Sequence, residues 1–192
     1  MNGPLLWYVN RGSGVALLAL LSVVVVLGIV STWGSAGGRA PRFLLQSLHR
    51  NLALLAVLML VAHIGSAVAD TYVDIRWWQA LVPAGATYRP VWLELGTWSL
   101  DIILVVTATS LLRTRLRHRS WRIVHLAAYA AWGLALVHGY RIGTDSAQPW
   151  TRWVDAVCIA VVVFAATARL VTVLLRPHRL GTAPVDHVGT AS

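Results

Sequence analysis

Long apolar runs, separated by short polar segments, dominate the pattern of residues along the chain. A helix rises about 1.5 Å per residue, so about 20 apolar residues are needed to cross the roughly 30 Å hydrocarbon core of a bilayer. Five runs reach this length, at about 13–33, 43–68, 91–112, 121–140 and 151–175. Because the backbone must satisfy its own hydrogen bonds in lipid, the pattern predicts five transmembrane α-helices.

Composition supports the membrane class, since 57% of the 192 residues are hydrophobic and the mean hydropathy is +0.66. We therefore expect an all-α integral membrane helix bundle over residues 1–176. The first run is too long for a signal peptide and no small-residue cleavage site follows it, so we expect it to stay as a helix of the mature protein. Residues 177–192 read as a short, polar, disordered cytoplasmic tail.

The net charge of +9 comes from arginine alone, because all 16 basic residues are arginines. Most of them follow the first and fifth runs or join the third to the fourth: Arg39, Arg42, Arg50, Arg113, Arg115, Arg117, Arg119, Arg122, Arg169, Arg176 and Arg179. By the positive-inside rule this placement predicts an outside N-terminus and a cytoplasmic C-terminus. Charge placed in this way indicates membrane topology and no nucleic-acid partner.

Two further features bear on the organisation of the bundle. The longest connection on the outer side, residues 70–90, carries Trp77, Trp78 and several Pro and Gly residues, so we expect it to lie on the membrane surface or over the mouth of the bundle. The single cysteine, Cys158, excludes a disulfide or a thiolate metal site within one chain.

Four of the seven histidines lie inside predicted spans, His49 and His63 on the second and His125 and His138 on the fourth. An imidazole without a partner in hydrocarbon is costly. Interhelical hydrogen bonding explains one isolated histidine, but two similarly spaced pairs favour a shared role. The two spans run in the same direction, and separations of 14 and 13 residues correspond to about 21 and about 20 Å along a helix. The histidines should therefore face each other at two depths, one cytoplasmic and one outer.

Opposed neutral imidazoles in a helix bundle are what a six-coordinate haem iron accepts as axial ligands. Zinc is disfavoured, because the HExxH pattern is absent and the two levels are too far apart for one tetrahedral centre. Copper or a proton relay fits the spacing as well.

One angular test separates the two helices. A step of 14 residues falls about 40° short of four full turns, so His49 and His63 share a face, whereas a step of 13 leaves His138 about 140° from His125. The fourth span must therefore be overwound, kinked or tilted, and Gly133 is a candidate site for a kink.

The segments "LHRNLALLAVLMLVAH" and "SWRIVHLAAYAAWGLALVHG" resemble the paired histidine helices of the ferric reductase-like transmembrane domain superfamily. That superfamily includes ferric reductases, NADPH oxidases and the haem-bearing membrane subunit of the bacterial periplasmic methionine sulfoxide reductase system. The resemblance extends over most of the chain and implies a multi-pass protein of the bacterial plasma membrane. It also implies two b-type haems, an inner one held by His49 and His125 and an outer one held by His63 and His138.

The chain departs from the oxidases of that superfamily because it has no GxGxxG in a βαβ context, so a quinol or a separate flavoprotein would supply the electrons. The resemblance implies transmembrane electron transfer to a separate acceptor such as a ferric chelate, oxygen or a periplasmic redox protein. Two alternatives stay open: a non-catalytic haem-binding or anchoring subunit of a reductase complex, and a haem-free protein whose histidines only pack helices.

Residues beside the histidines are secondary candidates. Arg50 and Arg122 could bind the propionates of the inner haem or, equally, phospholipid headgroups. Arg89 and Arg141 are the corresponding candidates on the outer side. Trp132, midway between His125 and His138 in the sequence, would lie between the two haems or simply fill the bundle core.

Asp101 is a carboxylate deep in the third span. We expect it to form a structural bond, to a Ser or Thr hydroxyl or to an arginine, in preference to a role in quinol proton chemistry.

Overall fold

The computed structural model describes residues 3–32, 41–70, 75–143 and 148–175. These ranges form five long helices and one short one: α1 (Gly3–Ser31), α2 (Arg42–Ala69), the 3-10 helix η1 (Trp77–Ala80), α3 (Pro90–Leu111), α4 (His118–Ile142) and α5 (Pro149–Leu174). No strand occurs in the described part of the chain. The described residues are thus all-α, as predicted, and all five long helices are long and apolar enough to cross a membrane. The predicted tail, Arg39, Arg176 and Arg179 lie outside the described residues.

Local sequence explains where these helices start and why they persist. Pro90 and Pro149 stand at the starts of α3 and α5, where the missing N–H costs nothing and the fixed φ favours a helix. α1 begins ten residues before its predicted start and includes the β-branched run from Val23 to Val26, which forms helices poorly in water. In lipid no solvent competes for its backbone groups, so the helix is the favoured state.

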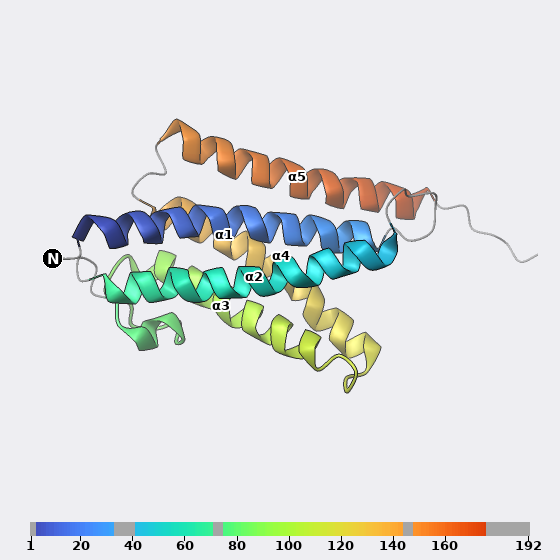
Figure 1. Ribbon diagram of the computed structural model, residues 1–192, viewed down its shortest axis with the longest axis horizontal. Coiled ribbons are helices and arrows are strands. Elements are labelled where there is room, and N and C mark those ends of the chain that lie inside the picture. Colours follow the sequence, from blue (N-terminus) through green and yellow to red (C-terminus); the bar gives the residue numbers. More distant parts are fainter. Residues whose placement is uncertain (1–2, 33–40, 71–74, 144–147, 176–192) are drawn as a thin grey trace, which may run out of the picture.

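The long helices alternate in direction along the bundle (Figure 1). α1 packs along α2 and α3 packs along α4, and α1 also contacts α4 and α5. The two helices that carry the histidines, α2 and α4, run in the same direction and lack this close backbone packing within the described residues. Each histidine helix is therefore held by its own hairpin partner, and its histidines face the other across the interior.

The course of α4 agrees with the tilted arrangement expected from the angular mismatch of its histidines. In Figure 1, α4 passes behind α1 and α2 from one side of α2 to the other. The two ends of α4 therefore approach α2 from opposite sides. In such an arrangement two residues on different faces of α4, such as His125 and His138, can both point toward α2. The helix is continuous through Gly133, so no break at that residue is involved.

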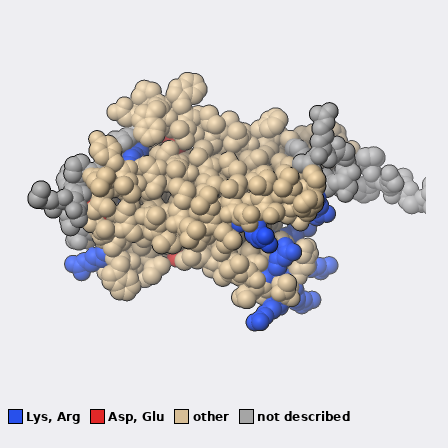
Figure 2. All heavy atoms as spheres, viewed as in Figure 1, with Lys and Arg blue, Asp and Glu red and all other residues tan. Residues whose placement is uncertain are grey.

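Charged side chains are sparse along the length of the bundle, and arginines gather mainly at one end (Figure 2). Large apolar side chains such as Leu58, Leu111 and Phe164 are exposed, as suits contact with lipid chains. The basic end, as we call it, carries the α3–α4 turn and the starts of α2 and α4, with Arg42, Arg50, Arg113, Arg115, Arg117, Arg119 and Arg122. We call the opposite end, where α1 begins, the N-terminal end.

The connection between α2 and α3 covers part of the N-terminal end. Gln79 of η1 is buried, donates to the carbonyl of Gly85 (2.9 Å) and accepts at its own carbonyl from the hydroxyl of Thr97 on α3 (2.9 Å). Ile75 and Ala80 line the cavity described below. We expected this connection either on the membrane surface or over the mouth of the bundle. Its described part, residues 75–89, lies over the mouth.

Candidate functional site

The four intramembrane histidines come together in two pairs, one from each end of α2 and α4. In the basic-end pair, the ring centres of His49 and His125 are 6.1 Å apart and the ring planes make an angle of 66°. This pair joins residues 76 positions apart in the sequence. It is one of the two juxtapositions that the depth argument predicts.

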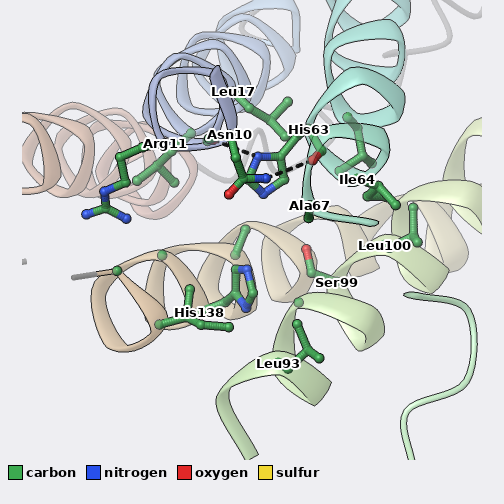
Figure 3. A pocket seen from close by; sticks show the side chains of 18 of the residues that line it. Asn10, Arg11, Leu17, His63, Ile64, Ala67, Leu93, Ser99, Leu100 and His138 are labelled. Atoms are coloured by element: carbon green, nitrogen blue, oxygen red, sulfur yellow. Dashed lines mark hydrogen bonds between the residues drawn. The ribbon is translucent and has the colours of Figure 1, made fainter. Parts of the chain in front are cut away.

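In the N-terminal-end pair, His63 of α2 and His138 of α4 point into one cavity (Figure 3). The cavity has a volume of about 240 Å³ and is walled largely by apolar side chains, Leu17, Leu18, Leu21, Leu60, Ile64, Leu93, Leu100 and Ile103 among them. Its polar lining includes Asn10, Arg11, Asp70 and Asp155. All five long helices thus contribute to the surroundings of this pair.

Each of the four imidazoles is hydrogen-bonded through Nδ1 to a neighbouring helix. The partners are the carbonyl of Val24 for His49 (2.9 Å), the carbonyl of Asn10 and the hydroxyl of Ser13 for His63 (3.1 and 3.2 Å), the carbonyl of Trp92 for His138 (2.7 Å) and the hydroxyl of Ser110 for His125 (3.3 Å). These bonds hold the rings in place from α1 on one side and from α3 on the other.

The bonds also determine which nitrogen carries the proton. A carbonyl can only accept, so the Nδ1 atoms of His49, His63 and His138 carry the hydrogen in the neutral ring and Nε2 keeps its lone pair. The hydroxyl of Ser110 can accept from His125 in the same way. None of the described residues hydrogen-bonds an Nε2 atom of these four rings. A neutral imidazole with Nδ1–H anchored and Nε2 available is the form in which histidine binds a metal.

Any metal at either pair would have few protein ligands. Among the described residues, no three His, Cys, Asp or Glu side chains gather closely enough to hold an ion. Each level therefore offers two imidazoles facing each other, and further ligands would have to come from a bound group.

Aromatic rings extend the basic-end pair toward the surface. Trp121 stacks on His125, with ring centres 5.0 Å apart and an interplanar angle of 26°, and the ring of His118 lies 5.7 Å from Trp121. The spacing of i, i+3 and i+7 places these three side chains on one face of α4. The indole Nε1 of Trp121 is buried without a partner in the described chain.

Trp132 lies between the two histidine levels, as its sequence position predicts. Its Nε1 donates to the hydroxyl of Ser22 on α1 over 2.9 Å, and Ser22 lies between the α1 residues that contact His63 and His49. The indole therefore crosses from α4 to α1 near the middle of the bundle.

The arginine candidates differ between the two ends. Arg50 and Arg122 are both exposed. Arg50 follows His49 directly, and Arg122 stands three residues before His125. At the other end, Arg89 donates to the carbonyl of Arg141 (2.8 Å), and the guanidinium of Arg141 lies 4.8 Å from the ring centre of Trp92. The N-terminal-end arginines thus join α3 to α4 close to the carbonyl that holds His138.

Within the described ranges, Asp101 lacks the structural bond that we expected. It lies in the middle of α3 and is partly exposed, and no described residue donates to it or pairs with it. Ser99, two residues earlier, does cross to α4 and donates to the carbonyl of Ala131 (2.8 Å). The hydroxyl of Ser99 faces the interior, and Asp101 lies 200° further around the helix.

The fold and these contacts define a multi-pass helical membrane protein with two facing pairs of anchored histidines. Residues 5–145 match the family described as "Domain of unknown function (DUF8596)", and the chain belongs to that family. The matched segment contains all four histidines and every residue that bonds their Nδ1 atoms. No curated protein and no solved structure matches the chain.

Proposed function

We propose that this protein carries electrons across a membrane through two b-type haems, one between His49 and His125 and the other between His63 and His138. The observation that carries the proposal is the shared geometry of the four imidazoles: each is anchored through Nδ1, and none of their Nε2 atoms is bonded by a described residue. Haem supplies one-electron redox chemistry when bound. His49 with His125 and His63 with His138 would hold the two haems, and the chain would also set the distance between the two levels and supply an apolar surrounding.

The basic-end pair fits this role by distance. Two imidazoles on opposite sides of one metal ion, each with Nε2 about 2 Å from it, have ring centres roughly 6 Å apart. The ring centres of His49 and His125 are separated by 6.1 Å. Arg50 and Arg122 are exposed at the same end and are suited to pair with the propionates.

The N-terminal-end pair fits by its surroundings. Apolar walls, two facing imidazoles and a few polar groups are the features of a buried cofactor site. The volume of about 240 Å³ is below the roughly 300–1,000 Å³ of ordinary ligand sites, so admission of a macrocycle requires the Leu and Ile side chains of the walls to move outward.

The topology of the proposal follows from charge. The basic end, with its exposed arginines, is placed in the cytoplasm and the N-terminal end outside, in the plasma membrane of a bacterium. The basic-end pair then meets a cytoplasmic or membrane donor, a quinol or a separate flavoprotein. The other pair faces an external acceptor such as a ferric chelate, oxygen or a redox protein. The resemblance of the histidine spacing to the ferric reductase-like superfamily supports the same assignment.

Trp132 supports an electron path between the two levels. Its indole donates to Ser22, which lies on α1 between the residues that contact His63 and His49, and this bond fixes the ring there. In the proposed function Trp132 lies between the two haems.

The first test is the absorption spectrum of the purified protein, expressed with adequate haem. We expect about two haems per chain, with the spectrum of low-spin bis-histidine haem. His49→Ala and His125→Ala should remove one redox component, and His63→Ala and His138→Ala the other. His118→Ala is the matched control, because His118 is an exposed histidine of the same helix and should leave both components in place.

Two results would reject the proposal. A protein without a Soret band would exclude both haems, and His49→Ala and His138→Ala removing a common component would contradict the pairing. Vesicles carrying the purified protein then separate an electron conduit from a haem-binding subunit without turnover. Only a conduit re-oxidises its haems when an impermeant acceptor is added on the side opposite the donor.

A further inference from the structure

Three of the four histidines lie against a glycine of the neighbouring helix. A Cβ atom built on the glycine would lie 3.0 Å from His63 Cε1 at Gly14, 3.2 Å from His49 Cε1 at Gly28, and 2.6 Å from His138 Cε1 and Nδ1 at Gly96. Contacts under 3.0 Å are essentially never seen for real Cβ atoms, and those of 3.0–3.4 Å are tighter than most. An alanine at any of these positions would press on an imidazole.

The glycines repeat the register of the histidines. Gly14 and Gly28 are 14 residues apart on α1, as are His49 and His63 on the antiparallel α2. On α3, Gly96 lies against His138, and Ser110, 14 residues later, bonds His125. Each histidine pair thus has one small residue on α1 and one on α3. These are Gly14 and Gly96 at the N-terminal-end pair, and Gly28 and Ser110 at the basic-end pair.

Each glycine also stands in a fixed relation to the hydrogen bond that anchors its histidine. The carbonyls that accept from Nδ1 belong to Asn10, Val24 and Trp92, and in every case the glycine is the residue four positions later: Gly14, Gly28 and Gly96. A helical side chain leans toward the N-terminus, over the turn that precedes it. Glycine at i+4 therefore uncovers the carbonyl of residue i, which can accept a second hydrogen bond from the imidazole.

We propose that Gly14, Gly28 and Gly96 are positioning residues that set the imidazoles of His63, His49 and His138 for coordination of the two haems. This inference rests on the proposed function and names residues that act on the ligands and not on the haem. Ser110 is the fourth member of the set, and its hydroxyl takes the place of the uncovered carbonyl at His125.

Close packing of helix backbones is the ordinary reason for a glycine in a membrane helix, and the contacts argue against it here. All the atoms nearest to the built Cβ at these three positions belong to the histidine rings, and none to a neighbouring backbone. Four other helical glycines, Gly12, Gly65, Gly133 and Gly139, have nothing within 4 Å of a built Cβ. The space left by the first three is therefore specific to the imidazoles.

Replacing each glycine by alanine in the full-length protein tests the proposal, with haem content, redox titration and spin state as readouts. Gly96→Ala should remove or strongly perturb the component held by His63 and His138, Gly14→Ala should perturb the same component less, and Gly28→Ala should perturb the other component. The order follows the clearances of 2.6, 3.0 and 3.2 Å. Gly12→Ala and Gly133→Ala are matched controls on α1 and α4, since neither glycine has a neighbouring atom within 4 Å of a built Cβ. Alanine favours a helix more than glycine does, so weaker helix formation cannot explain a loss.

Each variant carries its own folding control, because the component at the other level should keep its wild-type spectrum and midpoint potential. The proposal is overturned if all three variants keep both components with unchanged potentials and low-spin spectra, or if Gly12→Ala and Gly133→Ala cause the same losses. A wild-type protein without haem overturns the proposed function itself, and this inference with it. The haem content of the wild type therefore tests the proposed function first, and the glycine variants then test this inference separately.

Discussion

Trp132 of α4 donates its indole N–H to the hydroxyl of Ser22 on α1 over 2.9 Å, and Ser22 in turn donates to the carbonyl of Leu18 on its own helix over 2.8 Å. Only 2% of the Ser22 surface is exposed, so this chain of bonds lies in the interior. It connects α1 to α4 at mid-height, between the two histidine pairs. The register of α1 against α4, which carries His125 and His138, depends on it.

Trp132→Phe should keep the aromatic ring and lose the bond to Ser22. The loss of one such bond costs about 1 kcal/mol, so the thermal midpoint in detergent should fall modestly while both haems are retained. Trp132→Leu should in addition slow the transfer of electrons between the two haems after rapid reduction of one. Trp98→Phe, a change at an exposed tryptophan of α3, should alter neither property. Equal transfer rates in wild type and Trp132→Leu would remove Trp132 from the electron path.

The Ser110 hydroxyl is a partner that a substitution can delete without leaving a second one, because His125 has no other hydrogen bond among the described residues. The other three rings each bond a carbonyl, and His63 bonds the hydroxyl of Ser13 as well. Ser110→Ala leaves the Nδ1 of His125 without its partner and adds no bulk. Loss of such a partner commonly weakens metal binding by about 10–100-fold, so the component held by His49 and His125 should be lost first on haem titration.

Thr109→Ala is the matched control for Ser110→Ala, since the hydroxyl of Thr109 bonds only to carbonyls of α3. Its haem affinity should be that of the wild type. Equal affinity in Ser110→Ala and Thr109→Ala would mean that the 3.3 Å contact does not orient His125.

Arg50 and Arg122 test the charge around the basic-end pair. Reduction adds an electron, and a nearby positive charge stabilises the reduced form, so removing the charge should lower the midpoint potential. Arg50→Gln and Arg122→Gln should each lower the potential of the component held by His49 and His125 and leave the other unchanged. Arg115→Gln removes the same charge from the α3–α4 turn. If Arg115→Gln lowered the midpoint potential by the same amount, the effect would come from the overall charge of the basic end. That result would contradict pairing of Arg50 and Arg122 with the propionates.

The run lengths and histidine spacings are enough to predict most of the fold and the four candidate ligands. Lipid leaves few options for a 20-residue apolar run, which is why a long helix occurs at each of the five predicted spans, although α1 begins ten residues early. The meeting of His49 and His125 follows from depth alone, because parallel helices bring equal depths together. The sequence also contains the glycine pattern, because Gly14 and Gly28 are separated by the same 14 residues as His49 and His63.

Other features depend on relations that a sequence does not express. The carbonyls of Asn10, Val24 and Trp92 bear no mark in the sequence, because every residue has a carbonyl. The 140° offset of His138 from His125 goes with a tilted course of α4 across α2, and periodicity along one helix says nothing of its tilt. The expected bond of Asp101 is not found among the described residues, because composition indicates a need for a partner and not the direction of the side chain.

Asp101 and Ser99 give a final test, since they lie two residues apart on α3 with opposite surroundings. The hydroxyl of Ser99 is buried and bonds Ala131 of α4, so Ser99→Ala should lower stability by about 1 kcal/mol. Asp101 lies mid-helix with no partner among the described residues, and a carboxylate at the centre of a bilayer costs about 2.5–3.5 kcal/mol on insertion scales. Asp101→Leu should therefore raise the thermal midpoint in lipid nanodiscs and leave both haems bound. A lower midpoint would show that the carboxylate has a partner in the membrane, and unchanged stability with loss of quinol-driven reduction would assign it to proton transfer.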